Sequence, residues 1–423
     1  MSDINYLKRL FQDYYRNNTN KIPPIDSLNQ REFGFIPWDN IIIMNRHISF
    51  VNYEAFKNYL SKFSPRHIYS SGALYNNPDH SDMNKKGHLG CDFLIDIDVD
   101  HFYTPCKEDH DLWYCKKCGK DGIGMAPNKC PKCENSLFKS LSWICDRCLS
   151  LAKNEIFKLI EDFLVPDFKI NKEELKIVFS GHRGYHLKIE KEKMRNLSSA
   201  ERREIVDYLT GENISYEILG LSDLNSNLYF LEGNYGWTEK IIKKIKKIVQ
   251  DYPNDVLRNV LTDYGLNRDI IEYILNDKDN FLKNLWRIKG LGEKTWANFL
   301  DNITKNLGAK IDVPVSIDIH RLIRYPGSLH GSTGFRVQEL SLSELETFNP
   351  LNENTQEIDP IVFAEKKDVK IKIEILENKV PAIKIKGKTY GPYNKGTIEI
   401  IPLYVAVFLL CKGVAKTRSL IDD

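Results

Sequence analysis

The chain has 423 residues, enough for two or three hydrophobic cores, and its 42% hydrophobic and 28% charged residues are typical of a globular protein. Its 60 basic and 58 acidic residues give a net charge of +2, which excludes a uniformly basic nucleic-acid binder, so any basic surface must be local. No apolar run approaches the ~20 residues that span a bilayer, and the N-terminus lacks a signal-peptide core. We therefore expect a cytoplasmic protein that makes no membrane contact.

The first elements surround an unusual acidic segment. A helical pattern near 5–16 is followed by strand-like pieces such as 41–50. The stretch FLIDIDVDHF then alternates Asp96, Asp98 and Asp100 with aliphatic residues. Because alternate residues of a strand share a face, this pattern predicts a strand over 93–99 with its carboxylates on one side.

The acidic strand is a candidate metal site. Carboxylates at i and i+2 lie about 6–7 Å apart at their Cα atoms, so Asp96 and Asp98 can reach one divalent cation or a pair. Mg²⁺ and Mn²⁺ prefer such oxygen ligands. The alternative is an exposed edge strand whose charges discourage aggregation, but aspartate is depleted in strands. We favour the metal site, and we leave Asp100 out of it because the strand gives way there to the next segment.

A Cys-rich segment follows at 103–148 and is poor in aliphatic residues, so it needs a metal to fold. In a cytoplasmic protein its cysteines favour zinc over disulfides, and two CxxC pairs have the spacing of a zinc ribbon. We expect two closed structural zinc sites; the alternative is one site with spare thiols. The expected ligands are Cys115, Cys118, Cys130 and Cys133 in the ribbon, and Cys106, His110, Cys145 and Cys148 in a second site, with His101 as a less favoured substitute for His110.

A helix should begin near Cys145 and end at Pro166, followed by strands at 176–180 and 185–189 with a hairpin turn between them. The turn carries the sequence SGHRGYH. Glycines let a backbone approach an anion, and serine, arginine and histidine side chains supply donors for phosphate oxygens. A polar turn with incidental charges explains this segment alone equally well. The candidate phosphate donors here are Ser180, His182, Arg183 and His186.

The rest of the chain contributes a second donor-rich cluster. Residues 200–307 should be largely helical, and 288–296 weakly resembles the hairpin of a helix-hairpin-helix motif. Strand patterning returns over 313–340, with Asp318 in a strand-like alternation. A Lys-rich β segment over 368–400 and a buried apolar element over 401–411 end the chain. The second cluster contains Asp318, His320, Arg321, Arg324, Ser328 and His330. Together with the first cluster and the acidic strand, it fits a nucleoside triphosphate held by cations and divalent metal.

The chain resembles the small, catalytic subunit of archaeal and eukaryotic DNA primase, and the likeness is closer to the archaeal branch. The resemblance rests on four motifs in chain order: DID, a Cys/His knuckle, SGxRGxH and DIHRLIRxPGSLHG. The resemblance covers nearly the whole chain. It implies an α+β fold: a mixed α/β catalytic domain whose sheet core is related to the RNA-recognition motif, with an inserted helical subdomain and a zinc-binding insert. The expected regions are 1–102 (catalytic domain with the acidic strand), 103–150 (zinc-binding insert), 151–200 (nucleotide-binding hairpin), 201–308 (helical subdomain) and 309–423 (C-terminal part of the catalytic domain).

The resemblance also implies roles for single residues. Asp96, Asp98 and Asp318 would be the metal-binding aspartates. Glu32 and Arg46 would help to bind the initiating nucleotide. The triphosphate contacts would be Ser180, Arg183, His186, Arg324, Ser328 and His330. The chain departs from some relatives at His182, where they have arginine, and in its extra CxxC…CxxC ribbon.

The expected activity is therefore that of a DNA primase catalytic subunit. It would copy single-stranded DNA into short RNA or DNA primers from nucleoside triphosphates, with two Mg²⁺ or Mn²⁺ ions and one or two structural Zn²⁺ ions. Its expected partner is the large, iron–sulfur primase subunit in a heterodimer. One alternative is a stand-alone primase-polymerase for repair or plasmid replication. The other is a non-catalytic zinc-ribbon adaptor whose aspartates are structural.

Overall fold

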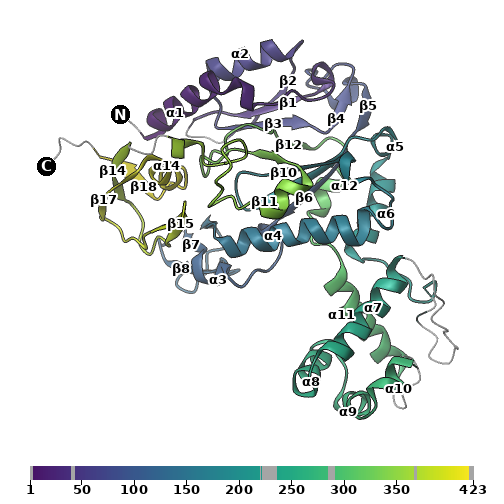
Figure 1. Cartoon of the computed structure of the whole chain (residues 1–423). Helices are drawn as coiled ribbons and strands as arrows, with labels where there is room; N and C mark the ends of the chain where they lie inside the picture. Colours follow the sequence, from purple (N-terminus) through teal and green to yellow (C-terminus); the bar gives the residue numbers. More distant parts are fainter. Residues whose placement is uncertain are drawn as a thin grey trace. The chain divides into compact units, whose positions relative to one another are not determined.

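A computed structural model describes residues 3–39, 43–219, 221, 236–283, 291–365 and 369–418. The protein is a mixed α/β chain with several small sheets (Figure 1). Its contacts divide it into two compact units, one formed by 1–156, 172–200 and 311–423, and the other by 157–171 and 201–310. The first unit holds every candidate site residue, so the account of function concerns this unit.

One four-stranded antiparallel sheet is built around the N-terminal segment. In the order β12-β3-β1-β2, its strands are Leu322–Arg324, His67–Ser71, Phe33–Ile36 and Asn45–Ile48. Helices α1 (Asp3–Asn17) and α2 (Tyr53–Phe63) run beside these strands (Figure 1). Aromatic side chains fill the space between them, and the rings of Phe33 and Phe56 lie 5.0 Å apart. This packing holds β3 and β12, which reach the cavity described below.

A second four-stranded antiparallel sheet carries the acidic strand. In the order β13-β10-β11-β6, its strands are Gln338–Leu340, Leu175–Phe179, Gly184–Ile189 and Phe93–Asp98. The predicted acidic strand and the predicted hairpin both form. The register pairs His186 with Asp96 and Gly184 with Asp98. Asp100 falls in a 3₁₀ turn, Val99–His101, directly after β6.

The prediction of a strand around Asp318 was wrong. The short helix α12 (Val313–Ile317) occupies this position and packs against β6. The side chain of Asp312 accepts a hydrogen bond from the backbone N–H of Val315, and Pro314 lies in the first turn. An aspartate cap followed by an early proline favours a helix start, and this local signal overrides the apolar alternation of the segment.

The Cys-rich segment forms a small three-stranded sheet next to a one-turn helix. The strands β7 (Leu112–Cys115), β8 (Asp121–Ile123) and β9 (Phe138–Leu141) have the order β8-β7-β9, and α3 spans Lys107–His110. Helix α4 (Asp146–Lys158) follows and continues as a π-helical segment, Leu159–Leu164. Strand β9 also reaches the cavity described below.

The C-terminal part is β-rich, as its sequence predicts, and it ends on a buried helix. Helix α14 (Leu403–Cys411) is buried along its whole length and contacts β14, β17, β18 and α1. The strands are β14 (Lys370–Ile375), β17 (Ile398–Pro402) and β18 (Ala415–Thr417) in one sheet, and β15 (Ile383–Ile385) and β16 (Lys388–Tyr390) in a hairpin. The other short elements of this unit are β4 (Ala73–Tyr75), β5 (His88–Cys91), α5 (Glu192–Arg195) and α13 (Leu342–Thr347).

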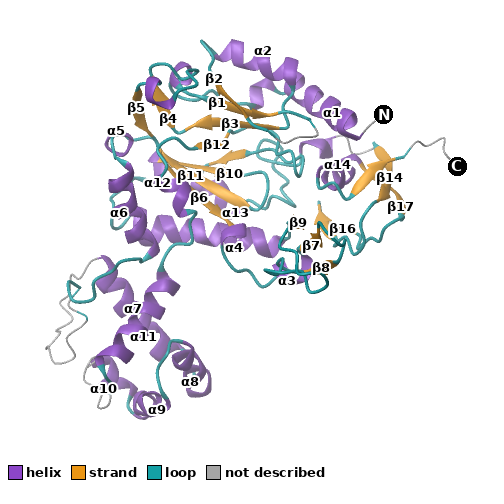
Figure 2. Cartoon of the chain, turned by 180° about the vertical axis from the view of Figure 1, so that it is seen from behind, coloured by secondary structure: helices purple, strands orange, loops and turns teal. Residues whose placement is uncertain are grey.

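The second unit is helical where the structure describes it (Figure 2). Its helices are α6 (Ser199–Thr210, which begins at the boundary), α7 (Gly236–Asp251), α8 (Asn254–Asp263), α9 (Arg268–Asn276), α10 (Lys278–Lys283) and α11 (Glu293–Leu307). The helix-hairpin-helix likeness at 288–296 lies partly outside the described residues. Within the described ranges, no helix has the length and apolar character needed to cross a membrane.

Candidate active site

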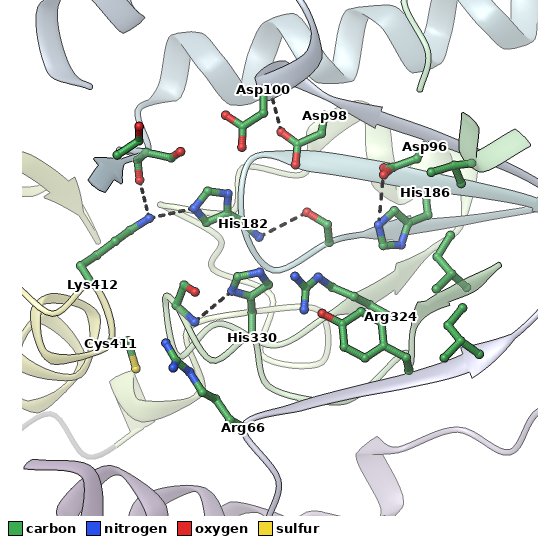
Figure 3. Close-up of a pocket in the computed structure, with 18 of the residues that line it drawn as sticks. Arg66, Asp96, Asp98, Asp100, His182, His186, Arg324, His330, Cys411 and Lys412 are labelled. Atoms are coloured by element: carbon green, nitrogen blue, oxygen red, sulfur yellow. Dashed lines mark hydrogen bonds and ion pairs between the residues drawn. The ribbon is translucent and has the colours of Figure 1, made fainter. Parts of the chain in front are cut away.

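A cavity of about 660 Å³ lies between the two four-stranded sheets. Strands β3 and β12 of the first sheet contribute Tyr69 and Arg324, whereas β6 and β11 of the second contribute Asp96, Asp98 and His186. Figure 3 shows its carboxylates on one side and most of its cationic side chains on the other. This separation of charge suits a ligand that carries both metal cations and phosphate.

The acidic side of the cavity consists of Asp96, Asp98 and Asp100. Burial and the charges of Asp98 and Asp312 raise the pKa of Asp96 to about 8. Burial and the charge of Asp100 also raise the pKa of Asp98. Carboxylates in this state repel one another, and a bound cation would relieve both the repulsion and the loss of hydration.

Two groups of oxygen and nitrogen atoms on this side have spacing that fits metal ions. Candidate ligand atoms of Asp96, His101 and Asp312 all lie within 4.8 Å of one another. Those of Asp98, Asp100 and His182 form a second such group. Oxygen-rich sets of this kind suit Mg²⁺ or Mn²⁺.

Asp312 was missed by the sequence reasoning, which selected Asp318. The backbone N–H of Asp312 donates to the carbonyl of Asp96 at 2.8 Å, which fixes its carboxylate near the acidic strand. Asp318 is exposed, and its carboxylate accepts a hydrogen bond from the backbone N–H of His320 at 2.8 Å. Neither Asp312 nor Asp318 lines the cavity, but Asp312 has a ligand atom within 4.8 Å of those of Asp96 and His101, and Asp318 belongs to no such group among the described residues. The aspartate-before-proline helix start at 312–314 was the signal that could have identified Asp312.

The opposite side of the cavity carries nitrogen donors. Burial lowers the pKa of His186 to about 3, with Arg324 acting in the same direction. Burial likewise holds the pKa of His182 and of His330 well below the usual histidine value, with Lys412 and Arg324 as the next causes. These imidazoles are therefore neutral in the free site and can each donate one hydrogen bond. The positive charge of this side comes from arginine and lysine.

The turn between β10 and β11 is shaped by two glycines. Gly181 has φ +78°, a left-handed conformation, and a Cβ there would lie 2.8 Å from His330 Cβ. A Cβ at Gly184 would lie 2.5 Å from the carbonyl oxygen of Ile97. Glycine at both positions lets the turn lie directly against the acidic strand and His330, so Ser180 and His182 line the cavity.

Of the predicted phosphate ligands, Ser180, His186, Arg324 and His330 line the cavity, but Arg183 and Ser328 do not. Ser328 donates its hydroxyl to the carbonyl of Tyr325 at 2.6 Å. The placement of Ser328 does not support a direct phosphate contact.

Arg183 is buried in a network of carboxylates. Its two terminal nitrogens each donate to a different oxygen of Asp111 at 2.8 Å, and its Nε donates to Asp100 at 2.9 Å. Burial opposes ionisation of Asp111, but hydrogen bonds from His110 and Arg183 hold its pKa well below the usual range. Arg183 thus connects the turn after the acidic strand to the Cys-rich segment.

Both predicted cysteine groups come together. The ligand atoms of Cys106, His110, Cys145 and Cys148 lie within 4.8 Å of one another, and so do those of Cys115, Cys118, Cys130 and Cys133. Tetrahedral zinc with bonds of about 2.3 Å places its sulfur ligands about 3.8 Å apart. The Sγ–Sγ distances are 3.3 Å for Cys106–Cys148, 3.5 Å for Cys115–Cys133 and 3.6 Å for Cys118–Cys130, so these groups could hold zinc.

His110, rather than His101, joins the first cysteine group. Its Nε2 lies 3.4 Å from Cys148 Sγ, and its Nδ1 lies 2.9 Å from Asp111. A carboxylate behind a ligating histidine is the usual second partner at a zinc site, and it sets the tautomer of the ring. His101 lies with Asp96 and Asp312 instead.

The pair expected at the initiating nucleotide lies outside this cavity. Glu32 is fully buried, and Arg46 Nε donates to it at 2.9 Å. Lys86 also contacts the Glu32 carboxylate at 3.1 Å. Glu32 thus orients the half-exposed Arg46, whose role in binding a nucleotide stays a prediction.

Comparisons with known proteins support the likeness seen in the motifs. Residues 134–342 match the family described as DNA primase small subunit. Proteins named DNA primase small subunit PriS are 32% identical in Methanosarcina barkeri and 30% identical in Methanosarcina mazei, each covering 97% of this chain and 96% of the relative. The protein of that name in Archaeoglobus fulgidus is 31% identical, with 98% of both chains covered.

Proposed function

Because this chain belongs to the DNA primase small subunit family, we propose that it is the catalytic subunit of a DNA primase. It synthesises short RNA or DNA primers on single-stranded DNA by nucleotidyl transfer from nucleoside triphosphates. The observation that carries this proposal is the cavity in which the acidic strand faces a cluster of phosphate donors (Figure 3). A non-catalytic adaptor has no use for that combination.

The acidic side supplies the metal ligands in this proposal. Asp96, Asp98 and Asp312 would hold two Mg²⁺ or Mn²⁺ ions, and the proximity of Asp312 to Asp96 supports it in place of Asp318. When bound, these ions would lower the pKa of the attacking hydroxyl and neutralise charge on the leaving pyrophosphate. The carboxylates fix the geometry of that site, because Asp96 and Asp98 lie two residues apart on one rigid strand paired to β11.

The opposite side binds and orients the triphosphate. Arg324, His186 and His330 would donate to its oxygens, and Ser180 would add a hydroxyl from the turn. These groups act by position and electrostatics, so no side chain forms a covalent bond to the substrate. The location of Arg183 supports a structural role, in which it holds Asp100 and Asp111 in place.

Two further parts of the proposal concern structure. Each cysteine group would hold one structural Zn²⁺ with no position left for water, so 103–150 would be a zinc-binding insert. In the second sheet, β6 and β10 are joined in the chain by α4 and have β11 between them, which is the split β-α-β arrangement. This part of the sheet supports a core related to the RNA-recognition motif, whereas the last strand, β13, pairs with β10 and not with β6. The five regions given above, including the helical subdomain, remain part of the proposal.

The proposed partners are single-stranded DNA and a large primase subunit that carries an iron–sulfur cluster, and the proposed location is the cytoplasm. A tagged chain should recover this subunit as a stable complex from its own cells. Recovery of an active chain without any such partner would favour the stand-alone primase-polymerase instead.

Incorporation of labelled ATP or dATP on unprimed single-stranded DNA tests the proposed activity. We expect template-dependent products that require Mg²⁺ or Mn²⁺ and that disappear in the Asp96→Ala, Asp98→Ala double variant while the fold and zinc content persist. Template binding without any incorporation would favour the zinc-ribbon adaptor. Undiminished synthesis by the double variant would remove the acidic strand from the mechanism.

A further inference from the structure

A buried lysine from the far end of the chain lines the candidate active site. Lys412 follows directly on the buried helix α14, and only 9% of it is exposed. Its Nζ lies 2.8 Å from His182 Nε2 and donates to the carbonyl of Ser142 at 2.5 Å. Figure 3 shows Lys412 extending to His182 at the edge of the cavity. Sequence reasoning gave this residue no role.

No ion pair joins Lys412 to a carboxylate among the residues that the structure describes. The charges of Asp100 and Asp111 favour its ammonium form, but both carboxylates are already paired with Arg183. The hydrogen-bond partners of Lys412 in the described ranges are a neutral imidazole and a carbonyl. A buried ammonium group is costly unless an anion compensates it, so its position at a cavity indicates an anionic ligand.

The surroundings of Lys412 also identify the part of the ligand. His182 stacks on His330, with ring centroids 5.2 Å apart, and both line the cavity. A ring nitrogen of His182 also lies within 4.8 Å of the ligand atoms of Asp98 and Asp100, so His182 neighbours both the acidic side and Lys412. In Figure 3 these rings lie between Lys412 and Arg324, whereas Asp96 and His186 lie at the other end. A triphosphate whose reacting phosphate lies at Asp96 would extend its remaining phosphates toward Lys412.

We propose that Lys412 is a nucleotide-binding residue that contacts the terminal phosphates of the incoming nucleoside triphosphate, acting with His182. The ammonium group of Lys412 lies 2.8 Å from His182 Nε2, so it brings a positive charge to the hairpin turn from a distant segment of the chain. This inference rests on the proposed function and adds to it the residue that distinguishes triphosphate from monophosphate.

Calorimetric titration of the full chain with MgATP, inorganic tripolyphosphate and AMP tests the inference. Loss of a charge-assisted hydrogen bond in Lys412→Gln should weaken binding of ATP and of tripolyphosphate by roughly 10- to 100-fold. AMP should bind unchanged, and Lys412→Arg should retain most of the affinity for triphosphate. Lys416→Gln is the matched control, since it removes the same charge from a half-exposed lysine paired with Glu374 at 3.2 Å.

The alternative is that Lys412 has only a structural role, in which its hydrogen bond to the carbonyl of Ser142 holds the end of α14 in place. In that case Lys412→Gln would lower the melting temperature and weaken AMP and ATP to the same extent, which would overturn the inference. Unchanged binding of tripolyphosphate by a folded Lys412→Gln variant would overturn it as well. Failure of the wild-type chain to make primers would instead count against the proposed function.

Discussion

Asp96 should destabilise the metal-free protein, because the fold buries a carboxylate beside two others. Its pKa is about 8 in the folded state and 3.8 in the reference state. A group whose folded pKa is raised loses stability as the pH rises from its unfolded value to its folded value. At pH 7 the cost is therefore at most about 4 kcal/mol, at about 1.36 kcal/mol per pH unit.

The realised cost should be smaller, because the Asp96 side chain keeps 20% of its exposure and water screens it. We expect Asp96→Asn, which keeps the shape and removes the charge, to raise the free energy of unfolding by about 1–3 kcal/mol at pH 7. The extra stability of the variant should be smaller at pH 5.5, because the wild type loses less stability there from the raised pKa of Asp96.

Urea unfolding followed by tryptophan fluorescence measures this gain, in buffer free of Mg²⁺ and Mn²⁺ but without a chelator that strips zinc. Added Mn²⁺ should stabilise the wild type more than the variant, because the variant has lost a ligand. Asp318→Asn is the matched control and should change neither quantity, since Asp318 is exposed and away from the cavity. A variant no more stable than wild type at pH 7, with the same dependence on pH, would refute the reasoning.

Two other outcomes follow from the structure. Arg183→Ala should destabilise the chain by about 3–5 kcal/mol in urea unfolding, because it removes the arginine that pairs with both Asp100 and Asp111. A raised KM for nucleotide with unchanged stability would restore the predicted phosphate contact. Metal analysis should find close to two zinc ions per chain and close to one after Cys115→Ser with Cys118→Ser; a value near one for the wild type would contradict the two-site account.

Features with a local cause were predictable from the sequence. Alternation of aspartate and aliphatic residues gave β6, the turn glycines gave the β10–β11 hairpin, and CxxC spacing gave both cysteine groups. Two of the site's members depend on contacts between distant segments. Asp312 reaches the acidic strand because α12 packs on β6, and Lys412 reaches the cavity because α14 is buried against the rest of its unit.

Tertiary contacts can also keep a residue of a motif away from the cavity, and Arg183 is such a residue. A motif of serine, arginine and histidine around two glycines is typical of phosphate binding, yet this arginine is satisfied by Asp100 and Asp111. The two carboxylates come from the turn after β6 and from the segment after α3, and nothing in the local sequence places them there. The motif does lie at the cavity, and the tertiary contacts separate its residues that line the cavity, such as Ser180 and His186, from Arg183 behind it.

Primer synthesis by Asp312→Asn and Asp318→Asn, measured side by side on unprimed single-stranded DNA with Mn²⁺, tests the central claim most directly. The account predicts a loss of roughly 100-fold or more for Asp312→Asn, because it removes a metal ligand beside Asp96, and near wild-type synthesis for Asp318→Asn. Normal synthesis by Asp312→Asn together with inactive Asp318→Asn would contradict it.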